Sequence, residues 1–318
     1  MLNNNFYKGE KLMKKTFALL LVLVMLVGMV ALSGCASNPQ PAAADKPAVS
    51  ESEQAPSESA EAEESETPAE TEQQEFRVGM ECNYAPFNWT QTDDSNGALE
   101  ISSGGFAGGY DVEIAKRIAE GLGKKLVIVK TEWDGLPPAL TSGKIDAIIA
   151  GMSPTEERKA TVDFTDNYYT SELVVVVKKD SQYANATSLA DFSGAKITGQ
   201  LNTFHYTVIP QIEGVKQQTA MESFPAMIVA LESGSIDGYI SERPGAVSAM
   251  ESNPDLMFIE FPEGKGFEAS PDDVAIAVAV AKGHEDLISA INKILADISE
   301  DERQELMNAA VKNQPVSE

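Results

Sequence analysis

Short apolar runs alternate with amphipathic stretches from residue 76 to the end of the chain. Several of the apolar runs are rich in valine and isoleucine, which is typical of strands buried in a parallel sheet. We therefore predict strands over seven segments: 76–80, 126–129, 147–150, 173–177, 195–198, 238–240 and 257–261. Strands that alternate with helices predict an α/β fold.

The amphipathic stretches predict helices that pack against these strands. One apolar stripe spans residues 114–122, where Asp111 is expected to cap the helix and Gly123 to end it. A second stripe spans residues 287–298, and residues 299–302 match a capping box that begins a last helix. These stripes indicate core packing and carry no function of their own.

An internal repeat divides the α/β region into two halves. The sequence ALTSGKIDAII at 139–149 recurs as ALESGSIDGYI at 230–240, with seven of eleven positions identical. Each copy is typical of a helix end, a glycine cap and a buried strand. An offset of 91 residues is too long for a solenoid. We therefore predict two lobes of similar topology: residues 76–177 with 281–318, and residues 180–272, joined by hinge segments at about 173–180 and 273–281.

The residues that follow the two repeated strands are expected to face a common cleft. Ligands of such sheets bind beyond the carboxyl ends of the strands, where the chain places residues 151–158 and 241–244. In the first segment, Ser153 is expected to cap a helix that has Pro154 at its first position.

Arg158 and Glu242 are the charged candidates at these strand ends. A guanidinium can clamp a carboxylate through two hydrogen bonds, and a carboxylate can hold an ammonium group. One cation facing one anion is the minimum site for a zwitterion. The same spacing is also explained if Arg158 pairs with Glu156 or Glu157 at the surface.

The first 75 residues have the pattern of a secretory signal followed by a linker. Lysines precede an apolar run at 17–32, which ends in Leu-Ser-Gly-Cys at 32–35. The run is short for a membrane-spanning helix and fits a secretory signal over residues 1–34, with Met13 as the expected start. Its end resembles the bacterial lipobox, so Cys35 is expected to carry lipid and to become the N-terminus.

Residues 35–75 are dominated by alanine, glutamate, serine and proline. Residues 36–75 contain ten glutamates, have a net charge of −10, and lack aromatic residues. Such a segment cannot bury enough apolar surface to offset the entropy of ordering it. We therefore predict a disordered acidic linker between the lipid and the folded lobes.

The net charge of −25 excludes a nucleic-acid partner, which requires a basic surface. The two cysteines and two histidines have no metal-ligand spacing, so neither a metal site nor a cofactor is expected. Cys82 is expected to be a small packed residue, and His205 a packing or surface residue of the second lobe.

Six motifs in order give the chain a family resemblance: NYAPF at 83–87, GGYDVE at 108–113, WDGL at 133–136, AGMSPTEER at 150–158, DFTDNYY at 163–169 and QLNT at 200–203. From residue 76 to the end, the chain resembles the polar-amino-acid-binding proteins of ABC importers, which have the type II periplasmic binding protein fold. The resemblance implies that a ligand bound between two lobes drives a hinge closure.

The resemblance also implies roles for individual residues. Arg158 would bind the α-carboxylate of the ligand, Glu242 the α-ammonium group, and Glu81 a cationic side chain. Aromatic walls would come from Tyr84 and Trp133 together with Phe87. The ligand-binding residues that it implies are Glu81, Tyr84, Phe87, Trp133, Gly151, Met152, Ser153, Arg158, Gln200, Asn202, Thr203 and Glu242.

The chain departs from the family pattern in three places. Glu242 stands where the family usually has aspartate, which lengthens the ammonium site by one methylene. Asn202 and Phe204 replace a glycine and a small hydroxyl residue, which puts the usual turn geometry in doubt. Residues 91–107 form a longer connection, with the composition of a glycine- and serine-rich loop or hairpin.

The resulting expectation is an extracytoplasmic, lipid-anchored and monomeric binding protein, not an enzyme. It would deliver an amino acid to an ABC permease driven by a cytoplasmic ATPase. Two alternatives are a secreted enzyme of the same fold, of the cyclohexadienyl dehydratase type, and a ligand-presenting sensor or adhesin. Glu81 and Glu242 favour a cationic ligand such as Lys, Arg or His, whereas Gln200 and Asn202 would suit a neutral polar side chain.

Overall fold

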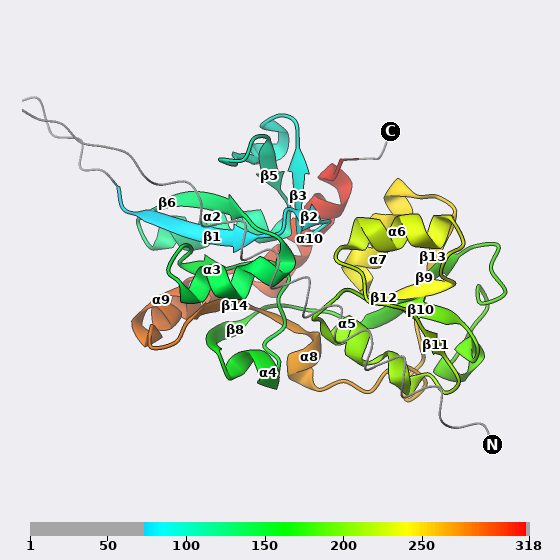
Figure 1. The fold of residues 1–318 in the computed structure, drawn as a ribbon. Coiled ribbons are helices and arrows are strands. Elements are labelled where there is room, and N and C mark those ends of the chain that lie inside the picture. The colour runs from blue at the N-terminus through cyan, green and yellow to red at the C-terminus, as the bar shows by residue number, and fades with distance from the viewer. Residues whose placement is uncertain (1–72, 316–318) are drawn as a thin grey trace, which may run out of the picture. The chain divides into compact units, whose positions relative to one another are not determined.

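The computed structural model describes residues 73–315. The expected signal peptide, the expected lipidation site at Cys35 and nearly all of the expected acidic linker therefore lie outside the described residues. Two five-stranded mixed sheets, each with helices packed around it, make up most of the described chain (Figure 1).

The first sheet has the strand order β6-β1-β7-β14-β8. Its strands are β1 (Glu75–Met80), β6 (Lys125–Lys130), β7 (Ala147–Ile148), β8 (Val162–Thr170) and β14 (Ala275–Ala281). We call this sheet the first lobe, together with the helices α2 (Tyr110–Gly121), α3 (Leu136–Thr141), α4 (Glu156–Lys159), α9 (Glu285–Ala296) and α10 (Glu300–Asn313).

The second sheet has the strand order β11-β10-β12-β9-β13. Its strands are β9 (Leu173–Lys178), β10 (Lys196–Thr198), β11 (Lys216–Gln217), β12 (Gly238–Glu242) and β13 (Leu256–Ile259). The second lobe comprises this sheet and the helices α5 (Phe204–Thr207), α6 (Phe224–Glu232) and α7 (Arg243–Ser252). The short helix α8 (Pro271–Val274) leads from this lobe into β14.

The two sheets have the same topology, as the repeat predicts. In each sheet the fourth strand in the order is antiparallel to both neighbours, whereas the second strand pairs in parallel. The prediction of parallel strands was therefore wrong for β9 and β13. An apolar run shows that a strand is buried on both faces but not in which direction it runs.

The expected lobe boundaries also differ from the structure. Residues 173–177 form β9 of the second sheet, and residues 275–281 form β14 of the first sheet. The chain therefore crosses between the sheets at residues 171–172 and 260–274. Each crossing follows an edge strand and leads into the fourth strand of the other sheet. The hydrophobicity of a strand does not show which of the two sheets it joins.

Both copies of the repeat fold alike. Gly143 and Gly234 end α3 and α6 with φ values of 71° and 72°, in the left-handed region that glycine adopts without strain. Asp146 and Asp237 then each accept a hydrogen bond of 2.8 Å from a backbone amide of the adjacent strand, that of Arg77 and of Lys196 respectively. The equivalent amides identify β1 and β10 as equivalent strands.

Two predicted caps differ from the structure and one agrees. Asp111 lies inside α2, whose N-cap is Gly109, and its carboxylate bonds elsewhere. Thr155, not Ser153, caps α4, because Pro154 precedes the cap residue instead of following it. Ser299 does cap α10 through the amide of Glu302, as predicted.

A small four-stranded sheet lies beside the first lobe, with the order β2-β3-β5-β4. Its strands are β2 (Asn83–Tyr84), β3 (Asn88–Gln91), β4 (Leu99–Glu100) and β5 (Phe106–Gly108). The longer connection at 91–107 is thus an antiparallel hairpin with a short 3-10 helix, η1 (Ser95–Gly97), before β4. Three further 3-10 helices are η2 (Trp133–Gly135), η3 (Leu189–Phe192) and η4 (Ile209–Gln211).

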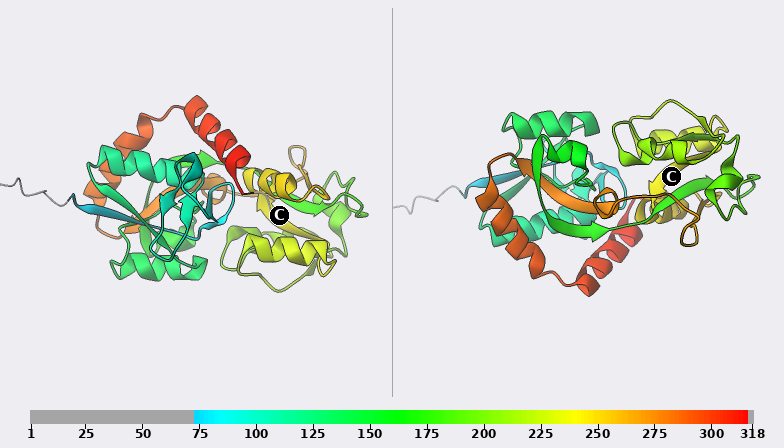
Figure 2. Two further views of the ribbon diagram at one scale, coloured as in Figure 1. Left: turned by 90° about the horizontal axis from the view of Figure 1, so that it is seen from above. Right: turned by 90° about the horizontal axis from the view of Figure 1, so that it is seen from below.

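The last helix, α10, contacts both lobes in addition to the two crossings. Figure 2 shows it running from the first lobe to α7 of the second. At its end the Gln314 side chain bonds to both the hydroxyl and the carbonyl of Ser248, and both residues are buried. Among residues 73–315 no helix is long and apolar enough to cross a membrane.

Candidate ligand-binding site between the two lobes

Glu81 and Gln200 meet where β1 and β10 end. The two residues occupy equivalent positions after equivalent strands, and Nε2 of Gln200 donates to Oε2 of Glu81 at 3.2 Å. Gln200 also donates to the carbonyl of Glu222 at 3.1 Å, so its amide group has two acceptors. Both side chains are buried, and Oε1 of Glu81 has no hydrogen-bond partner.

Aromatic rings from both lobes pack beside this pair. Tyr84 of the first lobe stacks on Phe224 of the second, with ring centroids 4.3 Å apart and planes 11° apart. Phe87 lies next to Tyr84, at 5.0 Å between centroids, and is fully buried against Tyr110 and Tyr169. Tyr84 and Phe224 thus form the aromatic contact between the lobes, and Phe87 supports it from the first lobe.

Glu242 and His205 form a buried pair in the second lobe. Oε1 of Glu242 lies 3.1 Å from Nε2 of His205, and the two side chains are 8% and 11% exposed. Glu242 is the last residue of β12, and His205 lies in α5, which follows the loop after β10. The negative charge of Glu242 also raises the pKa of Tyr84, although burial is the larger cause of that increase.

Unpartnered polar atoms concentrate at this place. Among the described residues, five buried side-chain nitrogen or oxygen atoms have no hydrogen-bond partner. Four of them are Oε1 of Glu81, the hydroxyl of Tyr84, Nδ1 of His205 and Oε2 of Glu242. A buried polar atom without a partner is costly, so this cluster of four is a candidate site for a polar ligand.

Arg158 bridges the lobes at the outer side of this cluster. Its guanidinium donates to the carbonyls of Ser153 at 2.9 Å and Asn202 at 3.1 Å, and lies 5.1 Å from the ring centroid of Trp133. Burial lowers the pKa of Arg158 to about 10. Of the two acids in the alternative of a surface pair, Glu156 pairs with Lys159, whereas the charge of Glu157 does act on Arg158.

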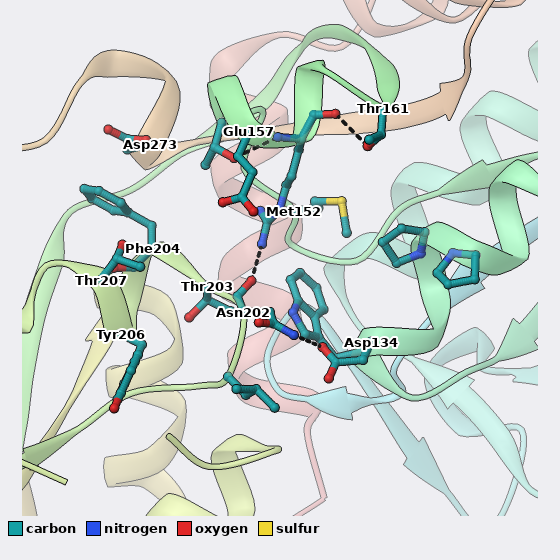
Figure 3. Close-up of a pocket in the computed structure, with 16 residues that line it drawn as sticks. Asp134, Met152, Glu157, Thr161, Asn202, Thr203, Phe204, Tyr206, Thr207 and Asp273 are labelled. Atoms are coloured by element: carbon teal, nitrogen blue, oxygen red, sulfur yellow. Dashed lines mark hydrogen bonds between the residues drawn. The ribbon is translucent and has the colours of Figure 1, made fainter. Parts of the chain in front are cut away.

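Asn202 resolves the doubt about the turn after β10. Its φ value is 55°, in the left-handed region that glycine prefers and that asparagine tolerates better than most residues. Its side-chain amide donates to Asp134 of the first lobe at 2.9 Å (Figure 3). Asparagine therefore keeps the turn that a glycine would make and adds a bond between the lobes.

A cavity of about 630 Å³ opens beside Arg158 and Asn202 (Figure 3). Both lobes line it, and its other charged residues, Asp134, Glu157 and Asp273, are all acidic. The predicted site residues thus fall into two groups. Trp133, Met152, Arg158, Asn202 and Thr203 line this outer cavity, whereas Glu81, Tyr84, Phe87, Gly151, Ser153, Gln200 and Glu242 do not.

Gly151 is held by a buried chain of hydrogen bonds that the sequence does not reveal. Its amide donates to the hydroxyl of Tyr168 at 3.2 Å, which donates to Asp111 at 2.7 Å. Asn88 donates to the other oxygen of Asp111, whose pKa burial raises to about 7. A side chain at position 151 would meet the ring of Tyr84 at 2.9 Å, so this strand end needs glycine.

Two residues of the cluster were missed or misassigned from the sequence. His205 was predicted to be a packing or surface residue, but it contacts Glu242. Phe224 was not singled out, although it follows Trp133 at the repeat offset of 91 residues. Extending the repeat in the N-terminal direction would have identified it.

These features define a two-lobed binding protein with a polar site between its lobes. Residues 76–311 match the bacterial extracellular solute-binding proteins, family 3, and the chain belongs to that family. It is an amino-acid-binding protein of the ABC transporter type, and family membership places it outside the cytoplasm.

Similar proteins whose names state a ligand support this assignment. A probable histidine-binding protein of Campylobacter jejuni is 32% identical over 199 residues, covering 62% of this chain and 72% of the relative. The L-cystine-binding protein TcyJ of Escherichia coli is 30% identical over 225 residues, covering 70% of this chain and 77% of the relative. The crystal structure of AbpA from Streptococcus pneumoniae bound to L-arginine gives a TM-score of 0.63 at 28% identity, covering 75% and 94%. These relatives are substrate-binding proteins and not enzymes.

Glu81 makes the stability of the ligand-free protein depend on pH. Burial raises its pKa to about 7, whereas an unfolded glutamate has a pKa of about 4.3. The folded state therefore holds a proton that the unfolded state releases between these values, and stability falls as pH rises from about 4.5 to 7. We predict that Glu81→Gln raises the melting temperature at pH 8 by on the order of 5 °C.

Thermal melts at pH 8 and pH 5 test this expectation. At pH 5 the gain should largely disappear, because the wild-type carboxyl is then protonated. Exposed Glu132→Gln serves as the control and should change neither melt. A Glu81→Gln protein that melts at or below the wild-type temperature at pH 8 would show that the buried carboxylate carries no such penalty.

Proposed function

We propose that this protein captures an amino acid with a cationic side chain between its lobes and delivers it to an ABC permease. The observation that carries the proposal is the balance of charge at the site. Two buried carboxylates, Glu81 and Glu242, belong to this cluster, and the charge of Glu242 acts on one guanidinium, that of Arg158. A zwitterion leaves one negative charge uncompensated, whereas a ligand with one further positive charge balances the site.

Each end of such a ligand has a group to receive it. Arg158 has five N–H donors, of which two bond to Ser153 and Asn202, so the others are free for the α-carboxylate. Oε2 of Glu242 suits the α-ammonium group. Oε1 of Glu81 suits the cationic side chain.

A neutral polar ligand has less support. The amide nitrogens that would recognise it are already bonded, that of Gln200 to Glu81 and Glu222 and that of Asn202 to Asp134. The ligands for which similar proteins are named include histidine and arginine as well as cystine. We therefore favour a basic amino acid.

Closure of the lobes follows from a ligand that contacts both. Arg158 and Glu81 belong to the first lobe and Glu242 to the second, so the ligand binds fully only when the lobes approach. The crossings at residues 171–172 and 260–274 are the proposed hinge. A permease that recognises the closed form would then receive loaded protein in preference to empty protein.

A ligand screen tests the proposed specificity. Among the twenty standard amino acids with ornithine and cystine, the largest thermal stabilisation should come from a basic amino acid. We predict that Glu81→Gln weakens L-arginine binding by about 30-fold or more, because a charge-assisted contact is lost. Wild-type affinity for L-arginine should also fall about tenfold from pH 8 to pH 6, since protonation of Glu81 competes with the cation.

Calorimetric titrations at the two pH values measure these effects. Glu132→Gln, which removes an exposed charge near Glu81, should leave the L-arginine affinity within about threefold of the wild type. If the best ligand is uncharged in its side chain and Glu81→Gln binds it equally well, the protein is not a receptor for basic amino acids.

Arg158→Ala tests the carboxylate clamp. Without the guanidinium, the α-carboxylate loses a charge-assisted partner, and we predict at least about a 100-fold loss of affinity with the fold retained. Circular dichroism checks the fold and calorimetry measures the binding. Lys159→Ala removes the neighbouring cation on α4 and should bind normally. Micromolar binding by Arg158→Ala would remove this residue from the site.

The proposed anchor is lipid on Cys35, which would hold the protein at the cell membrane. Support comes from the lipobox-like sequence at the end of an apolar run and from membership in an extracellular family. We predict that Cys35→Ser shifts most of the protein from the membrane fraction to the soluble fraction in a bacterial host. Immunoblots of both fractions measure this shift. An unchanged membrane fraction would argue for another mode of attachment.

A further inference from the structure

His205 has an environment that a packing residue does not need. Its Nε2 lies 3.1 Å from Oε1 of Glu242, and the ring meets Phe224 edge-on, with centroids 5.8 Å apart. Its other nitrogen, Nδ1, is buried and has no hydrogen-bond partner. The imidazole thus contacts Glu242 through one nitrogen, and its other nitrogen is buried without a partner.

The contact fixes how Glu242 presents its charge. An uncharged imidazole that donates through Nε2 occupies Oε1 and leaves Oε2 as the acceptor. A glutamate has one more rotatable bond than an aspartate, so more side-chain entropy is lost when its carboxylate is held in place. The 3.1 Å contact with His205 restricts that freedom before the ligand arrives.

The other charged or titratable groups near Glu242 come from the first lobe and from α7. Arg158 is close enough for Glu242 to influence its pKa, and so are Tyr84, Asp111 and Tyr169. On α7, Arg243 pairs with Glu260 instead. Among the described residues, His205 is therefore the one cation-forming side chain with a hydrogen-bond or ion-pair contact to Glu242.

We infer that His205 is a positioning residue for the ligand ammonium group, which it serves by orienting Glu242 when it is uncharged. This inference rests on the proposed function. An uncharged His205 leaves the pair with one negative charge that attracts the ammonium group. A positively charged imidazole at this position would cancel that charge, and the ammonium group would then bind more weakly. Histidine changes charge between about pH 5 and pH 8.

His205→Gln separates positioning from titration. The glutamine amide can still donate to Glu242 but cannot gain a proton. With L-arginine as the probe, we expect affinity within about threefold of the wild type at pH 7.5. When the pH is lowered from 7.5 to 5.5, the L-arginine affinity of the wild type should fall. The affinity of His205→Gln should fall about three- to tenfold less. His205→Ala removes the donor as well and should bind about tenfold more weakly at pH 7.5.

Two further proteins isolate the contribution of His205. Glu81→Gln removes a carboxyl group whose pKa burial raises to about 7, and should retain the part of the acid effect that belongs to His205. His284→Gln replaces the second histidine of the chain, which is exposed before α9, and should have the wild-type pH profile. Melting temperatures of all variants monitor folding separately from binding.

The outcomes distinguish this inference from the proposed function. If wild-type protein binds L-arginine and His205→Gln has the same pH profile, the inference is wrong and the function stands. Equal affinities of His205→Ala and wild type at pH 7.5 would also exclude positioning. If wild-type protein binds neither L-arginine nor any other amino acid, both proposals fail. The role of His205 is supported if the affinity of His205→Gln depends less on pH than that of the wild type, while Glu81→Gln keeps the part of the pH dependence that belongs to His205.

Discussion

The structure depends on carboxylates buried between two lobes. Glu81 and Glu242 each have one oxygen bonded within the protein and one without a partner. Removing a carboxylate from water is costly unless a cation or a donor replaces the water. Burial accordingly raises the pKa of Glu81 to about 7. A ligand that supplies positive charge lowers this cost only when both lobes surround it, and so binding is coupled to closure.

The repeated fold explains why these groups meet. Both sheets have the same strand order and the same antiparallel fourth strand. Equivalent strands β1 and β10 therefore end at equivalent places, and the residues that follow them, Glu81 and Gln200, bond to each other. The two lobes have the same topology, and the ends of their parallel strands face each other. Ligands of α/β sheets bind at such strand ends.

Much of this arrangement is predictable from the sequence. Every one of the seven predicted strands exists, and the 91-residue repeat gives the two lobes. Strand direction is not predictable, because a doubly buried strand has the same composition in either direction. The buried role of Asp111 and the contact of His205 with Glu242 depend on partners far away in the chain, and local spacing carries no record of them. The turn at Asn202, in contrast, depends on a local property, because asparagine tolerates the left-handed conformation that the turn requires.

Proton release on binding tests the central claim most directly. If a cationic side chain replaces the proton on Glu81, calorimetry with L-arginine at pH 7 in buffers of different ionisation enthalpy should show release of about half a proton per ligand. L-Glutamine, if it binds, should release almost none. Proton uptake, or no change, on binding of L-arginine would contradict the account, because Glu81 would then keep its proton in the closed site.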